Sequence, residues 1–304
     1  MTINIAVAVA EGLVMAADSW VQMANSAGKV STTHSSAEKL TEIGDRPIGV
    51  MIHGSGSIEK RSILSLIREF EFLEYAKEPR DIDSWSVWEM SARLAAFIEA
   101  RYGVALPAPP AGTSDDRPSL GLVVGGFSPG EFFPEVVTIE FPGPIIVREL
   151  PDRDLSVKPF GGWYVEFWGV RKALKRLIHG YDIASLEDIH GFLQWAEGQR
   201  ATGREDLGAV PPPPPVRPSE ALGPYGFFEQ LEHRLDGMPL QEAVEFADFL
   251  GTVAIGYDKF SKGDRSVGGD LDVLAIQPEG LSWYRRKPFA RQMAEARDGR
   301  MRRP

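Results

Sequence analysis

The sequence contains no cysteine among its 304 residues. Disulfide bonds, thiol catalysis and cysteine-ligated metal sites are therefore excluded. The five histidines are scattered without an HExxH or similar spacing, and so the sequence indicates no metal site. The short GSGS and GG stretches match neither the phosphate-binding P-loop nor the dinucleotide fingerprint. We therefore expect neither a metal nor another cofactor.

Positive charge and long apolar runs are also scarce. The chain has 33 lysine and arginine residues against 43 aspartate and glutamate residues, which gives a formal net charge of −10. A nucleic-acid-binding protein is expected to carry a basic face, so we expect no nucleic-acid partner. No run approaches the ~18 apolar residues of a membrane span, and the N-terminus lacks the pattern of a secretory signal. We therefore expect a cytoplasmic protein with no membrane partner.

The hydrophobic content and the position of a proline-rich tract predict one domain with an insertion. Hydrophobic residues make up 43% of the chain, which permits a substantial core. The tract PPPPPVRP at 211–218 favours extended polyproline geometry, either as a stiff surface insertion or as a ligand for a proline-binding module. The basic tail 285–304 is a solvated tail, a subunit contact, or an arm for RNA or membranes. We expect one domain over 1–304 with a helical, proline-rich insertion around 182–238.

Hydrophobic periodicity predicts strands and helices in separate runs along the chain. A first hairpin covers residues 3–17, a loop covers 19–37, and a second hairpin joins 39–43 to 47–53. Expected helices follow from about 63 to 73, from 84 to 103, at 163–180, at 185–199 and at 240–256, and expected strands lie at 119–127, 135–141, 144–150, 269–276 and 280–285. Segregated runs of this kind favour an α+β fold, with two antiparallel sheets face to face between helix layers, a four-layer αββα sandwich.

Thr2 and Asp18 are the first candidates for chemistry. After removal of Met1, a threonine hydroxyl can attack a carbonyl while its own amine, with an ordinary pKa near ~7.8, accepts the proton. The simpler interpretation of Thr2 is a strand-compatible residue. A three-residue turn at 10–12 would pair Asp18 with Asn4 and place it on the face of Thr2, whereas a two-residue turn would pair it with Ile5 on the other face. The sequence does not decide between these registers, and Asp18 is also a common type of turn former.

Lys39 and Gly54 are the next candidates. A lysine beside the terminal amine would lower the pKa of that amine, and Asp18 would hold the lysine charged. The alternative for Lys39 is a gatekeeper on an edge strand. Gly54, between a strand and a helix, lets a backbone N–H approach a developing oxyanion, although an ordinary turn explains it equally. His53 beside it is more typical of a packed residue than of a base.

The quoted motifs resemble a known family. Thr2, EGLVMAADS at 11–19, KLTEI at 39–43 and VMIHGSGS at 50–57 resemble a proteasome β-subunit of the N-terminal-nucleophile hydrolase superfamily. Near the C-terminus, GDRSVGG at 263–269 is similar to the segment that supports the amine in that family, with Val267 in the place of a serine. The resemblance implies the sandwich fold of that superfamily and a catalytic set of Thr2, Asp18, Lys39, Gly54 and Asp264.

The resemblance also implies an activity. We expect a threonine-type hydrolase that cleaves amide bonds of a peptide or protein substrate through an acyl-enzyme after Met1 is removed. Relatives of this kind assemble into rings, so we expect a homo-oligomer, with any ATPase or regulatory partner unidentified. Val267 favours an alternative, an inactive proteasome-like structural or regulatory protein, and a non-peptide amidase is a further one.

Overall fold

The computed structural model describes residues 2–24, 30–44, 46–77, 84–110, 113, 115–148, 164–169, 172–179, 237–262 and 265–287. The chain divides into two compact units, one formed by 1–171 with 236–304 and the other by 172–235. In the second unit the described part is helix α4 (Lys172–His179). The expected single domain with an insertion stays a prediction, because the proline-rich tract 211–218 and the helix expected at 185–199 lie outside the described residues. All that follows concerns the first unit.

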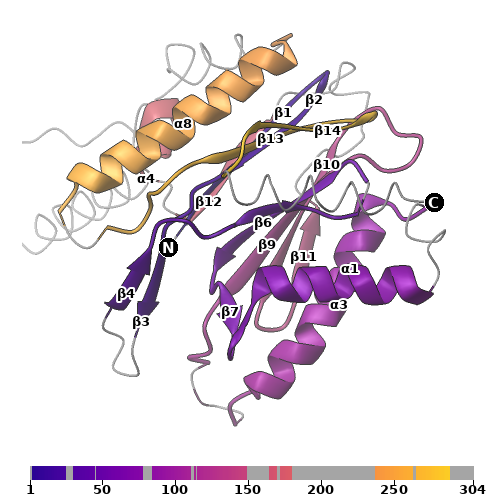
Figure 1. The fold of residues 1–304 in the computed structure, drawn as a ribbon, viewed down its shortest axis with the longest axis vertical. Helices are drawn as coiled ribbons and strands as arrows, with labels where there is room; N and C mark the ends of the chain where they lie inside the picture. Colours follow the sequence, from indigo (N-terminus) through magenta and orange to yellow (C-terminus); the bar gives the residue numbers. More distant parts are fainter. Residues whose placement is uncertain are drawn as a thin grey trace, which may run out of the picture. The chain divides into compact units, whose positions relative to one another are not determined.

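The first sheet has five antiparallel strands in the order β12-β1-β2-β13-β14. They are β1 (Ile3–Val9), β2 (Gly12–Ala17), β12 (Tyr164–Gly169), β13 (Asp272–Gln277) and β14 (Gly280–Arg285). Every residue of β1 and β2 is buried, which is typical of strands covered on both faces. Helix α8 (Leu240–Phe260) contacts β1, β2 and β13 and covers one face (Figure 1).

The turn of the first hairpin decides where Asp18 lies. β1 pairs with β2 so that Val9 is opposite Gly12 and Asn4 is opposite Ala17. Both expected registers of Asp18 are therefore wrong, since its N–H donates to the carbonyl of Ile3 at 3.2 Å. A Cβ atom at Gly12 would lie 2.6 Å from the carbonyl oxygen of Ile276, so the glycine belongs inside the sheet where two backbones come close, and not in the turn.

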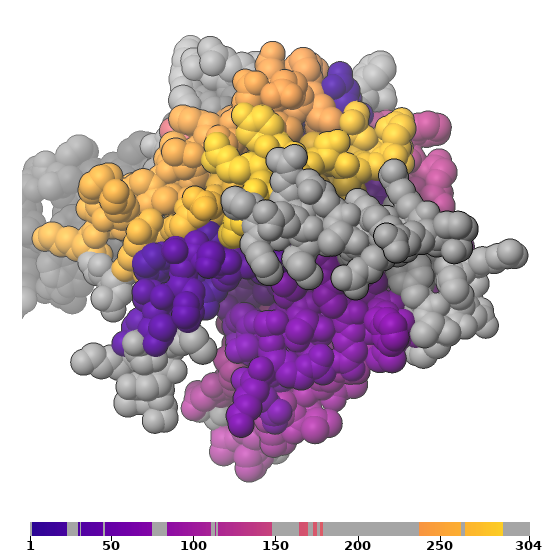
Figure 2. All heavy atoms as spheres, in the orientation of Figure 1, coloured from indigo at the N-terminus to yellow at the C-terminus, as the bar shows by residue number. Residues whose placement is uncertain are grey.

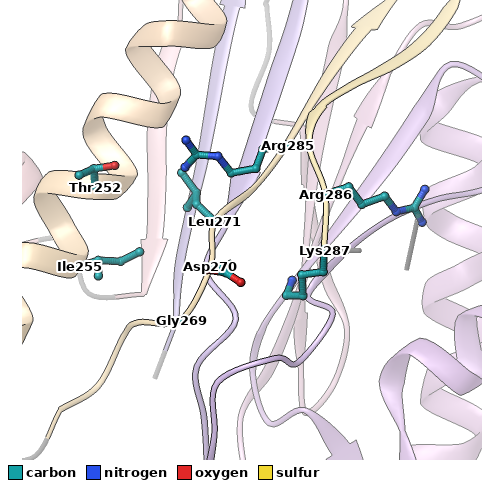
Figure 3. A pocket seen from close by; sticks show the side chains of 8 residues that line it. All are labelled: Thr252, Ile255, Gly269, Asp270, Leu271, Arg285, Arg286 and Lys287. Carbon is teal, nitrogen blue, oxygen red and sulfur yellow. The ribbon is translucent and has the colours of Figure 1, made fainter. Parts of the chain in front are cut away.

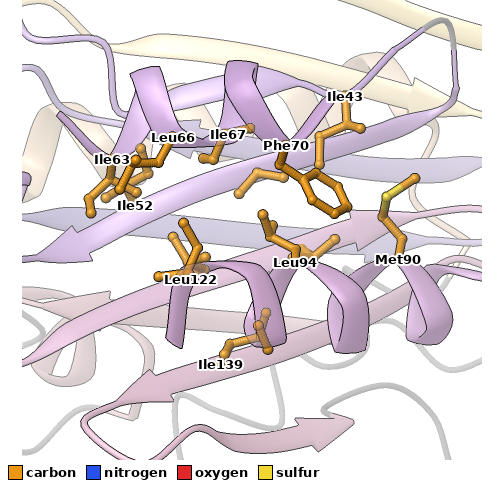
Figure 4. Close-up of a cluster of buried hydrophobic side chains, with 14 of the residues drawn as sticks. Ile43, Ile52, Ile63, Leu66, Ile67, Phe70, Met90, Leu94, Leu122 and Ile139 are labelled. Carbon is orange, nitrogen blue, oxygen red and sulfur yellow. The ribbon is translucent and has the colours of Figure 1, made fainter. Parts of the chain in front are cut away.

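The second sheet also has five antiparallel strands, in the order β11-β10-β9-β6-β5. They are β5 (Leu40–Glu42), β6 (Ile48–Gly54), β9 (Leu120–Gly126), β10 (Glu135–Phe141) and β11 (Ile145–Arg148). Helices α1 (Ile63–Lys77) and α3 (Val87–Ala105) pack in one hydrophobic cluster with this sheet (Figure 4). Ser86 caps α3 in a capping box with Glu89, two residues beyond the start expected from the sequence.

A second hydrophobic cluster joins residues of the two sheets. It contains Met15 and Leu274 of the first sheet together with Met51 and Val123 of the second. A Cβ atom at Gly49 would lie 2.9 Å from the sulfur of Met15, so the glycine leaves room for that side chain. We propose a four-layer αββα sandwich for this unit, supported by the shared cluster and by helices that pack against both sheets (Figure 1).

Two further segments differ from expectation. The loop expected at 19–37 contains the strands β3 (Val21–Ala24) and β4 (Val30–His34), a short two-stranded ribbon whose second strand is mostly polar. The helix expected at 163–180 begins instead as strand β12, whose aromatic and β-branched residues suit the edge of β1. Two short strands, β7 (Ser57–Ile58) and β8 (Arg61–Ser62), precede α1.

Segments far apart in the sequence meet beside the N-terminal hairpins. The side-chain amide of Gln22 donates to the carbonyl of Arg265 at 2.5 Å, and the guanidinium of Arg265 lies 4.7 Å from the ring centroid of Trp20. In Figure 2 the indigo surface of the N-terminal region accordingly lies against the orange and yellow surface of the C-terminal region. No helix in the described part of the chain is both long enough and apolar enough to cross a membrane.

Replacement of a core leucine on α3 tests the packing. Leu94 is fully buried, and we expect Leu94→Ala to lower the free energy of unfolding by roughly 2–5 kcal/mol, because it removes apolar contacts and leaves a cavity. Val104 on the same helix is 86% exposed, and Val104→Ala is the matched control with a change within about 0.5 kcal/mol. Urea denaturation followed by circular dichroism measures both. Equal losses in the two variants would contradict the described packing of α3.

Candidate active site

A buried cluster of a hydroxyl, an amine and a carboxylate lies at one end of the first sheet. Lys39 Nζ donates to Thr2 Oγ1 at 2.6 Å and to Asp18 Oδ1 at 2.8 Å. Thr2 is 3% exposed, Lys39 is 6% exposed and Asp18 is fully buried. We call these three residues the Thr2–Lys39–Asp18 cluster. Three polar groups are thus hydrogen-bonded in series out of contact with bulk water.

Elements of both sheets bring the cluster together. Thr2 directly precedes β1 and Asp18 directly follows β2, so the hairpin places both at the same end of the first sheet. Lys39 directly precedes β5 of the second sheet, and its carbonyl accepts a hydrogen bond from the N–H of Ile52 at 2.8 Å. The amine of Lys39 therefore links the second sheet to the first.

Backbone donors hold Asp18 in place. Its Oδ1 accepts from the N–H of Ile3 at 3.1 Å, in addition to Lys39. Its Oδ2 accepts from the N–H of Trp20 at 3.1 Å and of Gly268 at 3.0 Å. A buried carboxylate is tolerated when its oxygens are hydrogen-bonded and a cation lies beside it, and both conditions are met here.

Burial makes Lys39 chemically unusual. Removal from water lowers the pKa of the Lys39 ammonium from its ordinary value of 10.5, because the charged form loses hydration. The neighbouring Asp18 carboxylate opposes this shift, and the charge of Lys287 adds to it. An amine with a lowered pKa exchanges protons more readily near neutral pH than an exposed lysine does.

The segment after α8 completes the surroundings of Asp18. Asp258 Oδ2 accepts from the N–H groups of Ser266 at 2.6 Å and of Val267 at 3.0 Å, which holds this segment against the sheet. Sequence reasoning missed Asp258. The available signal was an aspartate near the C-terminal end of a helix. The helix dipole disfavours a negative charge there unless hydrogen-bond donors surround the carboxylate. Asp264, which we expected in the site, lies outside the described residues.

No hydrogen bond among the described residues joins Gly54 to the cluster, and its oxyanion role stays a prediction. Gly54 has a left-handed backbone with φ of 75°, and a Cβ atom there would lie 2.5 Å from the carbonyl oxygen of Ser119. This close approach to the neighbouring strand is a sufficient reason for a glycine at this position. His53 stacks on Gly121, and its Nε2 lies 3.3 Å from Glu140 Oε1, so it is a packed residue as expected.

Two residues near Thr2 went unnoticed in the sequence. Gly169 has a φ of 88°, and a Cβ atom there would lie 1.7 Å from the carbonyl oxygen of Thr2, so only glycine lets β12 end beside Thr2. Asn4 lies two positions along β1 and is fully buried, and its amide nitrogen and oxygen have no hydrogen-bond partner among the described residues. A polar residue within an otherwise apolar buried strand was the available signal for Asn4.

A cavity of about 350 Å³ lies close to the cluster, on the side of Asp18. It is lined by Thr252, Ile255, Gly269, Asp270, Leu271, Arg285, Arg286 and Lys287 (Figure 3). Gly269 follows the residue whose N–H binds Asp18, and the Ser19 hydroxyl donates to the carbonyl of Asp270 at 2.8 Å. The cavity therefore adjoins the backbone that holds Asp18, whereas Thr2 and Lys39 are not among its lining residues.

Comparisons with known proteins give a partial similarity to a group of reductases. No family model matches the chain. UDP-N-acetylenolpyruvoylglucosamine reductases of Burkholderia pseudomallei (strain 668) and Burkholderia mallei (strain NCTC 10229) are each 30% identical over 148 residues, which is 47% of this chain and 36% of each relative. The chain thus spans about a third of the length of these curated relatives. Their names describe reductases.

These comparisons correct the activity expected from the sequence. The resemblance to proteasome β-subunits finds no support in a family model, and the proteins that match are reductases. The prediction of a proteasome-like threonine peptidase, with its acyl-enzyme mechanism and its hydrolase class, was therefore wrong. The contacts that bring Thr2, Asp18 and Lys39 together do not depend on that assignment. Within the described residues, no group of three histidine, aspartate or glutamate side chains could hold a metal ion.

Asp18 is expected to be essential for stability. Asp18→Asn removes the charge that compensates the buried Lys39 ammonium, so we expect a loss of roughly 3–5 kcal/mol in the free energy of unfolding at neutral pH. Asp115 pairs with Arg117 on the surface, and Asp115→Asn is the matched control with a much smaller expected loss, because water screens an exposed pair. Chemical denaturation at neutral pH compares the two. A loss at Asp18 no larger than at Asp115 would show that the buried pair does not contribute as described.

The lowered pKa of Lys39 predicts a pH dependence of stability. The lysine in the unfolded chain keeps its proton up to a pKa of about 10.5, whereas Lys39 in the folded protein loses its proton at a lower pH. The unfolding free energy contributed by Lys39 therefore rises with pH once pH exceeds the folded pKa, and it levels off above 10.5. We expect wild type to gain stability relative to Lys39→Met as the pH rises from neutral toward 10.5 in urea titrations. A difference that stays constant or falls over this range would contradict the lowered pKa.

Proposed function

We propose that the chain is an enzyme whose reaction centre is the Thr2–Lys39–Asp18 cluster and whose chemistry is general acid–base proton transfer through the Thr2 hydroxyl. One observation carries the proposal: Lys39 Nζ lies 2.6 Å from Thr2 Oγ1, within the distance needed for direct proton exchange. The similarity to reductases supports an enzyme, since the matched relatives are enzymes.

The order of the three groups defines the proton path. In one direction, the neutral Lys39 amine accepts the proton of the Thr2 hydroxyl while that hydroxyl takes a proton from the substrate. In the other direction, the Lys39 ammonium donates to Thr2 while Thr2 protonates the substrate. Asp18 stabilises the ammonium in both cases. A positioned acid–base group of this kind contributes about 10²–10⁴-fold to a reaction rate.

The cavity that adjoins the backbone around Asp18, although Thr2 and Lys39 do not line it, has a size that suits a small molecule. Its volume of about 350 Å³ falls within the range of roughly 300–1,000 Å³ for ligand pockets. Because the peptidase assignment is corrected, the expected peptide or protein substrate is not carried forward. The homo-oligomeric ring and the cytoplasmic location stay predictions.

A second candidate function follows from the matched relatives. Their name identifies a reductase that acts on a sugar nucleotide with an enolpyruvyl group, and the similarity covers 47% of this chain. Reduction of a carbon–carbon double bond adds a hydride, which a reduced nicotinamide or flavin would have to supply, and a proton, which the cluster would supply. Binding of UDP-N-acetylenolpyruvoylglucosamine, followed by isothermal titration calorimetry, decides whether this substrate class applies.

Substitution of Thr2 tests the proposed proton transfer. Small metabolites, with that sugar nucleotide among them, are first screened for stabilisation of the protein on heating, and those that bind are assayed for turnover. We expect Thr2→Val to lower turnover by about 10²–10⁴-fold, because it removes the hydroxyl and keeps the shape of the side chain. Thr2→Ser should keep a larger share of the activity, since the hydroxyl remains.

Thr41 provides the matched control for this experiment. It is also a buried threonine, and its hydroxyl accepts from Arg68 at 2.6 Å, away from Lys39. Thr41→Val should therefore leave turnover near the wild-type value. If Thr2→Val and Lys39→Met both turn over substrate at the wild-type rate, the cluster is not the reaction centre.

A further inference from the structure

A second buried lysine–aspartate pair lies next to the cluster, and the proposed mechanism does not use it. Lys287 donates its N–H to Asp272 Oδ1 at 3.1 Å, and its ammonium forms an ion pair with Asp272 Oδ2. Lys287 is 8% exposed and Asp272 is 1% exposed. Two opposite charges buried at this depth cost hydration free energy that their attraction offsets only in good geometry.

Adjacent strand ends bring the two pairs together. Asp272 is the first residue of β13 and lies opposite Ala17, the residue before Asp18. Lys287 follows β14 and is one of the residues that line the cavity (Figure 3). Asp272 thus begins β13, Asp18 follows the end of the neighbouring strand β2, and each aspartate binds one lysine.

The charges around Lys287 come from several elements. Arg286 precedes it, and its guanidinium lies 3.4 Å from Glu38 and 3.3 Å from Glu42, which flank Lys39 in the sequence. Asp272 of β13 neutralises Lys287 most directly. Asp18 follows Ala17, the residue opposite Asp272, and Lys39 binds Asp18 from the start of β5. Burial lowers the pKa of Lys39 most, and the nearby charge of Lys287 lowers it further.

We propose that Lys287, held by Asp272, is a positioning residue that acts through Lys39. Its buried positive charge disfavours a second ammonium nearby, so the neutral amine of Lys39 is more available to accept the Thr2 proton. Asp272 limits this effect by partly neutralising Lys287. The inference rests on the proposed function for its catalytic meaning, but the effect of one lysine on the other is measurable without any substrate.

The experiment follows the protonation of Lys39 itself. Nuclear magnetic resonance of ¹⁵N-labelled lysine side chains gives the titration midpoint of the Lys39 amine in the full-length protein. We expect Lys287→Met to move this midpoint upward by on the order of half a pH unit or more, because a like charge is removed and Asp272 is left as an uncompensated anion. Asp272→Asn should move it downward, because Lys287 then keeps its full charge.

Two control variants test whether the shift comes from the charge of Lys287 and not from replacing a lysine in general. Lys287→Arg retains the positive charge and should leave the midpoint near that of wild type. Lys262→Met removes an exposed lysine beyond α8 and should leave it unchanged. Thermal unfolding of each variant confirms that it is folded, and Asp272→Asn keeps the test valid if Lys287→Met does not fold.

The outcomes separate this inference from the proposed function. A Lys39 midpoint that stays at the wild-type value in both Lys287→Met and Asp272→Asn overturns the role of Lys287, and the reaction centre can still be correct. A midpoint that moves as expected supports the inference. If the midpoint moves and Thr2→Val keeps full turnover, the proposed function fails and the electrostatic link between the two lysines stands.

Discussion

The hydrogen bonds of the Lys39 amine to Thr2 and Asp18 are the interaction on which the rest of the account depends. They join a residue from the second sheet to both strands of the first hairpin. They also explain why a carboxylate and an ammonium can be buried together, since each compensates the other. Without this contact, Thr2 would be an ordinary buried hydroxyl and Asp18 a residue that ends a strand.

Close backbone approach is the constraint that holds this end of the sheet in place. Gly12 lets β13 pass beside the start of β2, and Gly169 lets β12 end against the carbonyl of Thr2. Gly268 supplies an N–H to Asp18 from a segment that Asp258 fixes to α8. Several distant parts of the chain are therefore needed to define the surroundings of three side chains.

Local patterns in the sequence predicted most of the strands and helices but not the hairpin register. The alternation in Ile3–Val9 and the stripe from Ile63 to Phe70 gave β1 and α1 because strand and helix periods are visible in a short window. The hairpin register places Gly12 against the carbonyl of Ile276, which lies more than two hundred residues further along the chain. Strand β12 was missed for the same reason, because its pairing with β1 decides its conformation.

The candidate site was predictable in part. The structure brings together Thr2, Asp18 and Lys39, three of the candidates named from the sequence, although through a hairpin register that the sequence did not give. The close approach of the Ser119 carbonyl accounts for the glycine at position 54. Asp258 was identified only from the hydrogen bond that its carboxylate accepts from the backbone of Ser266. The Lys287–Asp272 pair joins residues from two strands whose spacing carries no sequence motif. The activity was not predictable, because the same three residue types suit several reactions and fold does not imply function.

The titration midpoint of the Lys39 amine in the wild-type protein tests the central claim most directly. Nuclear magnetic resonance of the labelled lysine side chains measures it from neutral to alkaline pH. The account predicts a midpoint below the ordinary value of 10.5, together with a resonance that changes when Thr2 is replaced by valine. A midpoint at or above 10.5, with no response to that replacement, would contradict a buried amine that exchanges protons with Thr2.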